Sequence, residues 1–447
     1  MCIDVFSLLF RPNIANMTNT TATARANNQP MNIAESRYRR RSKSVIFRLL
    51  TMSIAGAVAL VGAELTLRLV RDDDQFFPDH PNTVRNFYPS NEITPGVTGT
   101  SQVAINSYGT RGPELRDQRI RILTVGGSTT ACRILDDSET WPSLLMKNLN
   151  EAVDGNATVW VTNSGLCGRH SEHHVMHAKY LLPRLPRIDY MIVYAGINDV
   201  GNWLNNNDFD PHYLDSSPNW NTRVAESFSD CCFTSQTDPW FRHLQLWKRG
   251  STAKARLETW RTLAGSVNEN GVVVQDARLR WLARKQLKRQ KRQKVKIPAA
   301  KRATLPAALD SYAANLLSII DSARRQGTEP ILMAQAMPGH TLSPEERKRL
   351  WMGTMDRGKT YVFHSERLDV LAEYNDRMRS VAAERDVLFL DLPSHLNTVK
   401  NAYYDGCHLN EHGCRETARF VAQQIRPHLK LSDVAHRHPV CFEAVSR

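Results

Sequence analysis

The sequence has no two cysteines at Cys-x-x-Cys spacing, although it contains eight cysteines. Cysteine pairs at that spacing are typical of structural zinc sites, so a site of that type is excluded. Long apolar runs are scarce as well. The run from Leu49 to Ala63 has fifteen residues, which is fewer than the ~20 of a membrane-spanning helix. A spanning helix therefore needs residues from both flanks of this run.

Acidic residues are fewer than basic residues, and the difference varies along the chain. The 447 residues include 45 acidic and 58 basic side chains, a net charge of +13. Residues 1–48 carry eight basic against two acidic residues, and residues 201–304 carry nineteen against nine. The remainder of the chain is close to neutral. The basic character therefore belongs to two appendages and not to the body of the protein.

The N-terminal region combines a polar tail with an apolar segment. Residues 1–44 are rich in Asn, Thr, Ala and Arg without apolar periodicity, so we expect them to be disordered. Residues 45–70 reach spanning length if Arg48 extends its charge to the membrane surface. The preceding basic residues predict a cytoplasmic N-terminus, with everything after residue 70 outside. We favour an uncleaved signal anchor; the alternatives are a signal peptide cleaved after Val61-Gly62-Ala63 and a buried amphipathic helix.

Short apolar strands alternate with helices along the rest of the chain. This alternation indicates right-handed βαβ crossovers and a parallel sheet with helices on both faces. The predicted fold class is α/β, a three-layer αβα, flavodoxin-like arrangement around five parallel strands. We expect strands at 120–125, 157–162, 190–194, 330–334 and 387–390, and helices at 139–149, 171–182, 305–326, 368–385 and 411–425.

Composition predicts the domain boundaries. Residues 71–104 are expected to be a linker, 105–428 the folded domain and 429–447 a tail. An insertion at 201–304 holds six of the nine tryptophans and ends in a basic helix, 278–296. We interpret it as a small helical subdomain, or as a lid whose basic face meets anionic glycan or phospholipid headgroups. Nucleic acid would match the charge but not a location outside the cytoplasm, so no nucleic-acid partner is expected.

The chain is organised around the stretch that begins at Ile120. Its β-branched run stops at Gly126-Gly127 and then presents Ser128. Ligands of open α/β sheets bind at the carboxyl ends of the strands. A serine held directly after such a strand is therefore a candidate nucleophile. Taken alone, the stretch is equally well explained as a Gly-Gly-Ser turn without chemistry.

Other strand ends and a C-terminal loop supply what acyl transfer requires. His408 can accept the proton of Ser128, and Asp405 can orient the imidazolium. The side chain of Asn198 and the backbone N–H groups of Gly165 and Ser128 can form an oxyanion hole. These groups work without a metal or another cofactor, so we expect neither.

Four blocks of the sequence resemble the signature blocks of the SGNH hydrolases, also called GDSL-type esterases. The blocks are Gly126-Gly127-Ser128, Asn163-Ser164-Gly165, Gly196-Ile197-Asn198-Asp199 and Asp405-Gly406-Cys407-His408. The resemblance implies that Ser128, Gly165, Asn198 and His408 are the namesake residues and that Asp405 completes the triad.

Two further segments, 105–114 and 139–142, resemble a membrane-anchored bacterial branch of that family. This resemblance implies an anchor in the bacterial inner membrane and a periplasmic catalytic domain. One position departs from the family, because Gly127 stands where the family has an aspartate. That aspartate is not the base, so we expect activity to survive, with the rigidity of the serine turn in question.

Four histidines, at positions 170, 173, 174 and 177, fall on one face of a predicted helix. Paired histidines at that spacing can bind a transition metal. Glu172 is the only carboxylate nearby, so we favour an exposed, solvated face.

Cys132, Cys167 and Cys407 lie within four residues of candidate site residues. Disulfides are permitted in the predicted compartment, so a bridge bracing the site is a hypothesis whose pairing the sequence leaves open.

Together these features predict a membrane-anchored serine hydrolase that removes a small acyl group, such as acetate, from an envelope carbohydrate through an acyl-enzyme. A lipid or simple ester is a close variant of this substrate. A polysaccharide O-acyltransferase would use the same residues with a sugar hydroxyl in place of water. An inactive carbohydrate-binding or assembly protein is the alternative of another class, although the intact set Ser128, Asp405 and His408 argues against it. The sequence does not indicate the oligomeric state.

Overall fold

The computed structural model describes residues 33–69, 76–151, 158–206, 209–229, 240–247, 250, 253–254, 257, 293–339, 341–350, 352–356 and 360–429. The chain divides into two units, residues 1–66 and residues 67–447.

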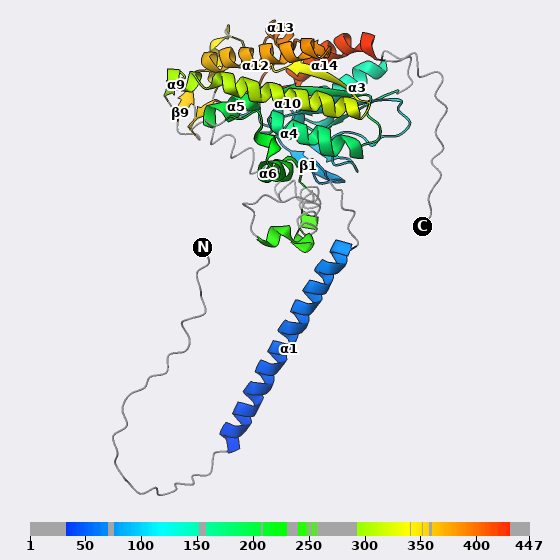
Figure 1. Cartoon of the computed structure of the whole chain (residues 1–447), viewed down its shortest axis with the longest axis vertical. Coiled ribbons are helices and arrows are strands. Elements are labelled where there is room, and N and C mark those ends of the chain that lie inside the picture. The colour runs from blue at the N-terminus through cyan, green and yellow to red at the C-terminus, as the bar shows by residue number, and fades with distance from the viewer. Residues whose placement is uncertain are drawn as a thin grey trace. The chain divides into compact units, whose positions relative to one another are not determined.

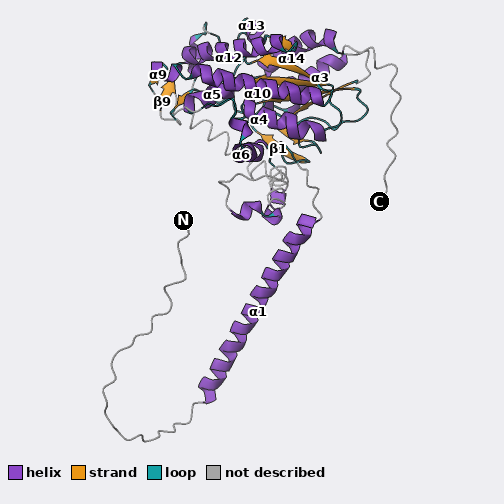
Figure 2. Ribbon diagram, in the orientation of Figure 1, coloured by secondary structure: helices purple, strands orange, loops and turns teal. Residues whose placement is uncertain are grey.

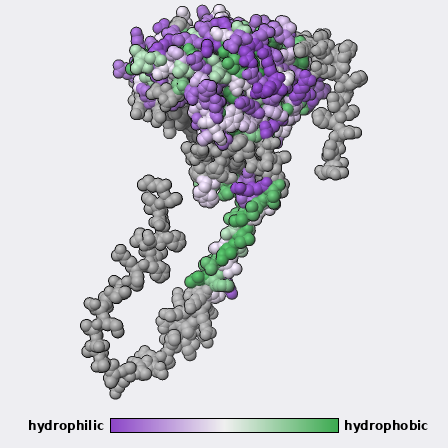
Figure 3. Space-filling model, in the orientation of Figure 1, coloured by the Kyte–Doolittle hydropathy of each residue, from purple (hydrophilic) through white to green (hydrophobic). Residues whose placement is uncertain are grey.

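The first unit consists, in its described part, of helix α1, which continues to Leu69. Helix α1 spans Ile33–Leu69 and therefore extends into the segment 1–44 that we expected to be disordered. Its part Ser44–Leu69 contains an 18-residue window with a mean hydropathy of 2.0 and is long and apolar enough to cross a membrane. The apolar side chains form a continuous band along the helix (Figure 3). Membrane anchors and signal sequences share this property.

A five-stranded parallel sheet forms the centre of the second unit (Figure 1). Its strand order, β10-β7-β5-β3-β4, places the first strand of the sheet between the second and the third. This is the flavodoxin-like order. The strands are β3 (Ile120–Gly126), β4 (Val159–Asn163), β5 (Tyr190–Ala195), β7 (Glu329–Ala334) and β10 (Leu388–Leu390).

Helices cover both faces of this sheet (Figure 2). Alternate residues of β3 point to opposite layers: Leu123 and Val125 pack with one helical layer, and Ile120 and Ile122 with the other. The first layer contains α4 (Ser171–Met176), α5 (Ile197–Asn205), α6 (Ser217–Ser227), α10 (Leu305–Arg325) and α12 (His364–Glu384). The second contains α3 (Trp141–Glu151), α13 (Leu392–Leu396) and α14 (Glu411–Ile425). The predicted three-layer α/β fold is confirmed.

Part of the predicted linker is folded. Strands β1 (Thr83–Phe87) and β2 (Ser101–Ile105) form an antiparallel pair, which lies within the segment 71–104 except for its last residue, Ile105. Phe87 and Val103 are buried between them with Ile105. The proline and glycine residues that suggested a linker instead form the turns around this pair.

Several further short elements lie at the end of the insertion and beyond it. They are β6 (Lys294–Val295), α9 (Ala299–Arg302), α11 (Pro344–Lys348), β8 (Thr354–Met355) and β9 (Thr360–Val362). Lys294 and Val295 pair with β9, so the predicted basic helix 278–296 is wrong at its end. Residues 278–292 of that helix lie outside the described residues.

The insertion does not enclose all of its tryptophans in a core of its own. Trp203 is fully buried in the main core, and the indole N–H of Trp220 donates to the Tyr180 hydroxyl. Trp240 and Trp247 are exposed. The last two tryptophans of the insertion, at positions 260 and 281, lie outside the described residues.

Candidate active site

Ser128 is the first residue of a one-turn helix at the end of β3. Helix α2 spans Ser128–Ala131 and begins directly after Gly127. Because the first residues of a helix have no intrahelical partner for their N–H groups, the Ser128 N–H is available to a ligand. The side chain is partly exposed, unlike Thr129 and Thr130, which are buried.

The structure brings together three predicted residues that are distant in sequence. The Ser128 Oγ lies 2.7 Å from Nε2 of His408. The other ring nitrogen of His408, Nδ1, lies 2.8 Å from Oδ2 of Asp405. Asp405 is itself held by the backbone N–H groups of Cys407 and His408, which donate to its Oδ1 at 2.9 and 2.8 Å. The relay therefore runs from a buried carboxylate, through the imidazole, to a partly exposed hydroxyl.

The electrostatic interaction between Asp405 and His408 favours a charged imidazole. Burial opposes ionisation of Asp405, but the charge of His408 and its hydrogen bonds outweigh burial and lower the pKa of Asp405. Burial likewise opposes protonation of His408, yet the Asp405 charge dominates and raises the His408 pKa well above 6.5. The site therefore stabilises the imidazolium that forms when a histidine accepts a proton.

Tyr404 supports the histidine ring, a contact that the sequence did not reveal. The two rings stack with centroids 5.4 Å apart and an interplanar angle of 5°. The Tyr404 N–H also donates to the His408 carbonyl at 3.0 Å. The loop from Tyr404 to His408 is thus closed by its own backbone hydrogen bond, and the Tyr404 ring packs against one face of the imidazole.

The Asn198 side chain lies beside Gly127, the residue that precedes the serine. It is the second residue of α5, and its Nδ2 donates to the Arg169 carbonyl at 2.8 Å. A Cβ atom on Gly127 would come within 2.1 Å of the Asn198 Nδ2. Glycine at position 127, where the family has an aspartate, therefore fits this site, because a side chain there would displace the Asn198 amide.

Gly165 does not have the role that we predicted. Its N–H donates to Oδ1 of Asn163 at 2.8 Å, so this N–H is not free for a substrate oxygen. A Cβ on Gly165 would come within 2.5 Å of the Ala131 backbone nitrogen, so glycine is required for close packing against α2. Three residues further, Gly168 is exposed, has a φ of +78° and makes no backbone hydrogen bond within the described chain. The sequence feature that could have indicated Gly168 is its Gly-x-x-Gly spacing from Gly165.

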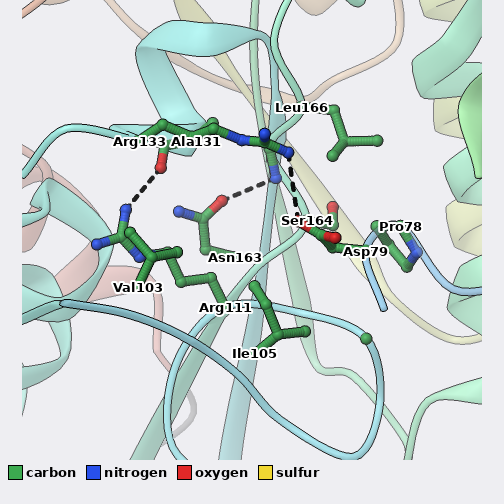
Figure 4. A pocket seen from close by; sticks show the side chains of 12 residues that line it. Pro78, Asp79, Val103, Ile105, Arg111, Ala131, Arg133, Asn163, Ser164 and Leu166 are labelled. Carbon is green, nitrogen blue, oxygen red and sulfur yellow. Dashed lines mark hydrogen bonds and ion pairs between the residues drawn. The ribbon is translucent and has the colours of Figure 1, made fainter. Parts of the chain in front are cut away.

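A small cavity adjoins Gly165 on the side of α2 (Figure 4). Its volume is about 20 Å³, and its walls include Ala131, Leu166 and Ile105. Arg133 lies at its edge and pairs with Asp79. A space of this size holds one water-sized group.

The histidine prediction was wrong about exposure. His170, His173, His174 and His177 are all buried, because α6 and the Phe228 ring cover the face that we expected to meet solvent. Burial lowers the pKa of His174 to about 3 and that of His177 to about 4. These side chains are therefore neutral core residues.

The proposed disulfide among Cys132, Cys167 and Cys407 is not formed: Cys132 and Cys407 are free thiols, and no bridge joins either of them to Cys167. The Cys132 Sγ lies instead 3.9 Å from that of Cys414, also a free thiol. Ligand atoms of Asp405, Cys407 and His408 lie within 4.8 Å of one another, the one such group among the described residues. Two of its three members already bond to each other within the relay.

Comparison with known proteins places this geometry in a family. Residues 124–415 match the GDSL-like Lipase/Acylhydrolase family. No curated protein matches the chain. A G-D-S-L family lipolytic protein from Desulfitobacterium hafniense is similar at 10% identity and a TM-score of 0.34, over 68% of this chain and 99% of that one. An acetylxylan esterase from Geobacillus stearothermophilus is similar at 15% identity and a TM-score of 0.34, over 70% and 96%.

The family match covers the central sheet from β3 onward and extends past the Asp405–His408 loop into α14. All four signature blocks of the sequence lie within it or at its margin. The chain therefore belongs to the GDSL-like lipase/acylhydrolase family and is an ester hydrolase with the SGNH hydrolase fold.

Proposed function

We propose that this protein is a membrane-anchored serine esterase that removes an acyl group, an acetyl group above all, from an envelope carbohydrate or lipid. The observation that carries the proposal is the relay in which His408 bonds to both Ser128 and Asp405. A binding protein has no need of a hydroxyl 2.7 Å from a histidine ring nitrogen that is oriented by a buried carboxylate.

Acylation begins at Ser128. Its Oγ attacks the ester carbonyl carbon while its proton passes to Nε2 of His408. Asp405 stabilises the resulting imidazolium through Nδ1. The tetrahedral intermediate then collapses, the imidazolium gives its proton to the leaving alkoxide, and the acyl group stays on Ser128. Water, deprotonated by His408, attacks the acyl-enzyme and releases the acid and the free hydroxyl of Ser128.

The negative charge of both intermediates develops on the former carbonyl oxygen. Two donors to this oxygen are the Ser128 N–H and the Asn198 Nδ2 hydrogen that does not bond to the Arg169 carbonyl. As a third donor we propose the N–H of Gly168 in place of that of Gly165, because the latter is engaged by Asn163. Gly168 precedes Arg169, whose carbonyl holds Asn198, so its loop is fixed relative to the other donors.

The choice of an envelope substrate is supported by the apolar helix Ser44–Leu69 and by the basic residues before it. By the positive-inside rule, both features support a location of the body of the protein on the outer side of a bacterial inner membrane.

A chain-length series of substrates tests the proposal. The full-length protein is assayed with 4-nitrophenyl acetate, butyrate and octanoate, and acetate release is measured from O-acetylated oligosaccharides. The proposal predicts that kcat/KM falls with acyl length and that acetate appears from the carbohydrate. A preference for octanoate would contradict the acetyl specificity, and acetate transferred to a second sugar without hydrolysis would instead indicate an acyltransferase.

A further inference from the structure

Helix α2 is so short that its own geometry cannot hold Ser128 in place. It has four residues, Ser128–Ala131, and Cys132 follows in the left-handed region at a φ of +45°. The last carbonyl groups of a helix have no intrahelical partners. Non-glycine residues rarely adopt a positive φ. The orientation of the serine therefore depends on groups outside the helix.

Side chains from three distant segments bind the carbonyl groups of this turn. The indole N–H of Trp141 donates to the Thr129 carbonyl at 3.2 Å, and Nδ2 of Asn163 donates to the Thr130 carbonyl at 2.7 Å. Nη1 of Arg111 donates to the next two carbonyls, of Ala131 at 2.8 Å and of Cys132 at 2.9 Å. Four consecutive carbonyl groups after the serine thus accept hydrogen bonds from side chains.

Arg111 contributes most to this arrangement. It is only 6% exposed, and its contact with the Ala131 carbonyl is visible in Figure 4. Its Nε donates to Oδ1 of Asp137 at 2.6 Å. Its Nη2 lies 2.7 Å from the Leu135 carbonyl and 3.4 Å from that of Gln102. Guanidinium has five N–H donors, and each has an acceptor here.

The backbone of Arg111 is fixed as firmly as its side chain. Its N–H donates to the Asn163 carbonyl at 2.8 Å, and its carbonyl accepts from the Asn163 N–H at 3.0 Å. Asn163 ends β4, beside Thr124 of β3 in the parallel register. The position of the guanidinium is therefore fixed relative to the sheet that carries the serine.

We propose that Arg111 is a positioning residue for Ser128, which holds the C-terminal end of α2 so that Oγ stays in line with Nε2 of His408. The inference rests on the proposed function, since it assigns Arg111 to the same acyl transfer. Lysine cannot replace it, because an ammonium has three donors without a planar fork. A displacement of about 1 Å at the reacting atoms costs on the order of 10²-fold in rate.

The test compares Arg111→Lys with wild type in the full-length protein, using 4-nitrophenyl acetate, the rate of fluorophosphonate labelling and the melting temperature. We expect kcat and the labelling rate to fall together by roughly 10²-fold, with KM much less changed. Arg223→Lys is the matched control, because Arg223 is also shielded and ion-paired, with Glu172 and Glu226, but contacts no part of α2. It should lose stability without a comparable loss of kcat.

Trp141→Phe provides a second variant, since it keeps the buried ring and removes only the donor to Thr129. It should lower kcat without raising KM, and it carries the test if Arg111→Lys does not fold. Wild-type kcat in the folded variants, or losses no larger than that of Arg223→Lys, would overturn the inference. An inactive wild type would instead contradict the proposed function, and this inference with it.

Discussion

At the scale of single residues, the site depends on a close contact between Gly127 and Asn198. The Asn198 amide occupies the space that a side chain at position 127 would need. Its bond to the Arg169 carbonyl uses one of its two N–H groups. In the proposed mechanism the other N–H donates to the oxyanion, and a donor of this kind stabilises the transition state more than the ground state.

Asn198→Ala should therefore lower kcat on the order of 10²-fold or more, with little change in KM. Steady-state kinetics with 4-nitrophenyl acetate measure this. Asn205→Ala is the control, because Asn205 lies on the same helix but binds the Gly201 and Thr354 carbonyls. Equal rates for wild type and Asn198→Ala would remove Asn198 from the oxyanion hole.

Residue roles were predicted unevenly from the sequence. Ser128, Asp405 and His408 could be identified because each residue type is chemically distinctive and follows a recognisable strand or turn. Gly165 was misassigned because a glycine can serve close packing or N–H donation, and only coordinates reveal the bond to Asn163. Arg111 was not singled out, since an arginine in a turn-rich segment looks like a surface residue until its five acceptors are known.

At the scale of elements, the loop from Tyr404 to His408 sets the pH range of the enzyme. His408 must be neutral to accept the serine proton, so activity requires a pH above its pKa. Asp405 raises that pKa above 6.5. The kcat/KM should therefore rise with pH, with a midpoint above that of an ordinary histidine.

Asp405→Asn removes the charge that favours the imidazolium and should shift the acid limb of this profile to lower pH while reducing the maximal rate. Profiles of kcat/KM against pH for wild type and variant measure both effects. A wild-type midpoint below 6.5, or the same midpoint in both proteins, would show that Asp405 does not control His408.

The strands and long helices were predictable because apolar runs and helical periodicity determine them locally. The environment of α4 was not predictable in this way. A helix with histidines on one face looks amphipathic, and its burial depends on α6, which arrives from the insertion. The β1–β2 pair was missed for a similar reason, since its few apolar residues gain their burial from each other.

At the scale of the whole molecule, the chain joins a family hydrolase body to an apolar helix and a basic insertion. The family match over residues 124–415 accounts for the fold and for ester hydrolysis, and the apolar helix Ser44–Leu69 lies outside it. The excess positive charge lies in the appendages, where it suits an anionic surface. Catalysis should therefore reside entirely in the second unit.

The measurement that tests the central claim most directly is labelling of the full-length protein with a fluorophosphonate probe. The account predicts one covalent adduct per chain in the wild type, located at Ser128 by peptide mass spectrometry, and none in Ser128→Ala at an unchanged melting temperature. A folded wild type that does not react, or an adduct that persists in Ser128→Ala, would contradict the assignment of Ser128 as the activated nucleophile.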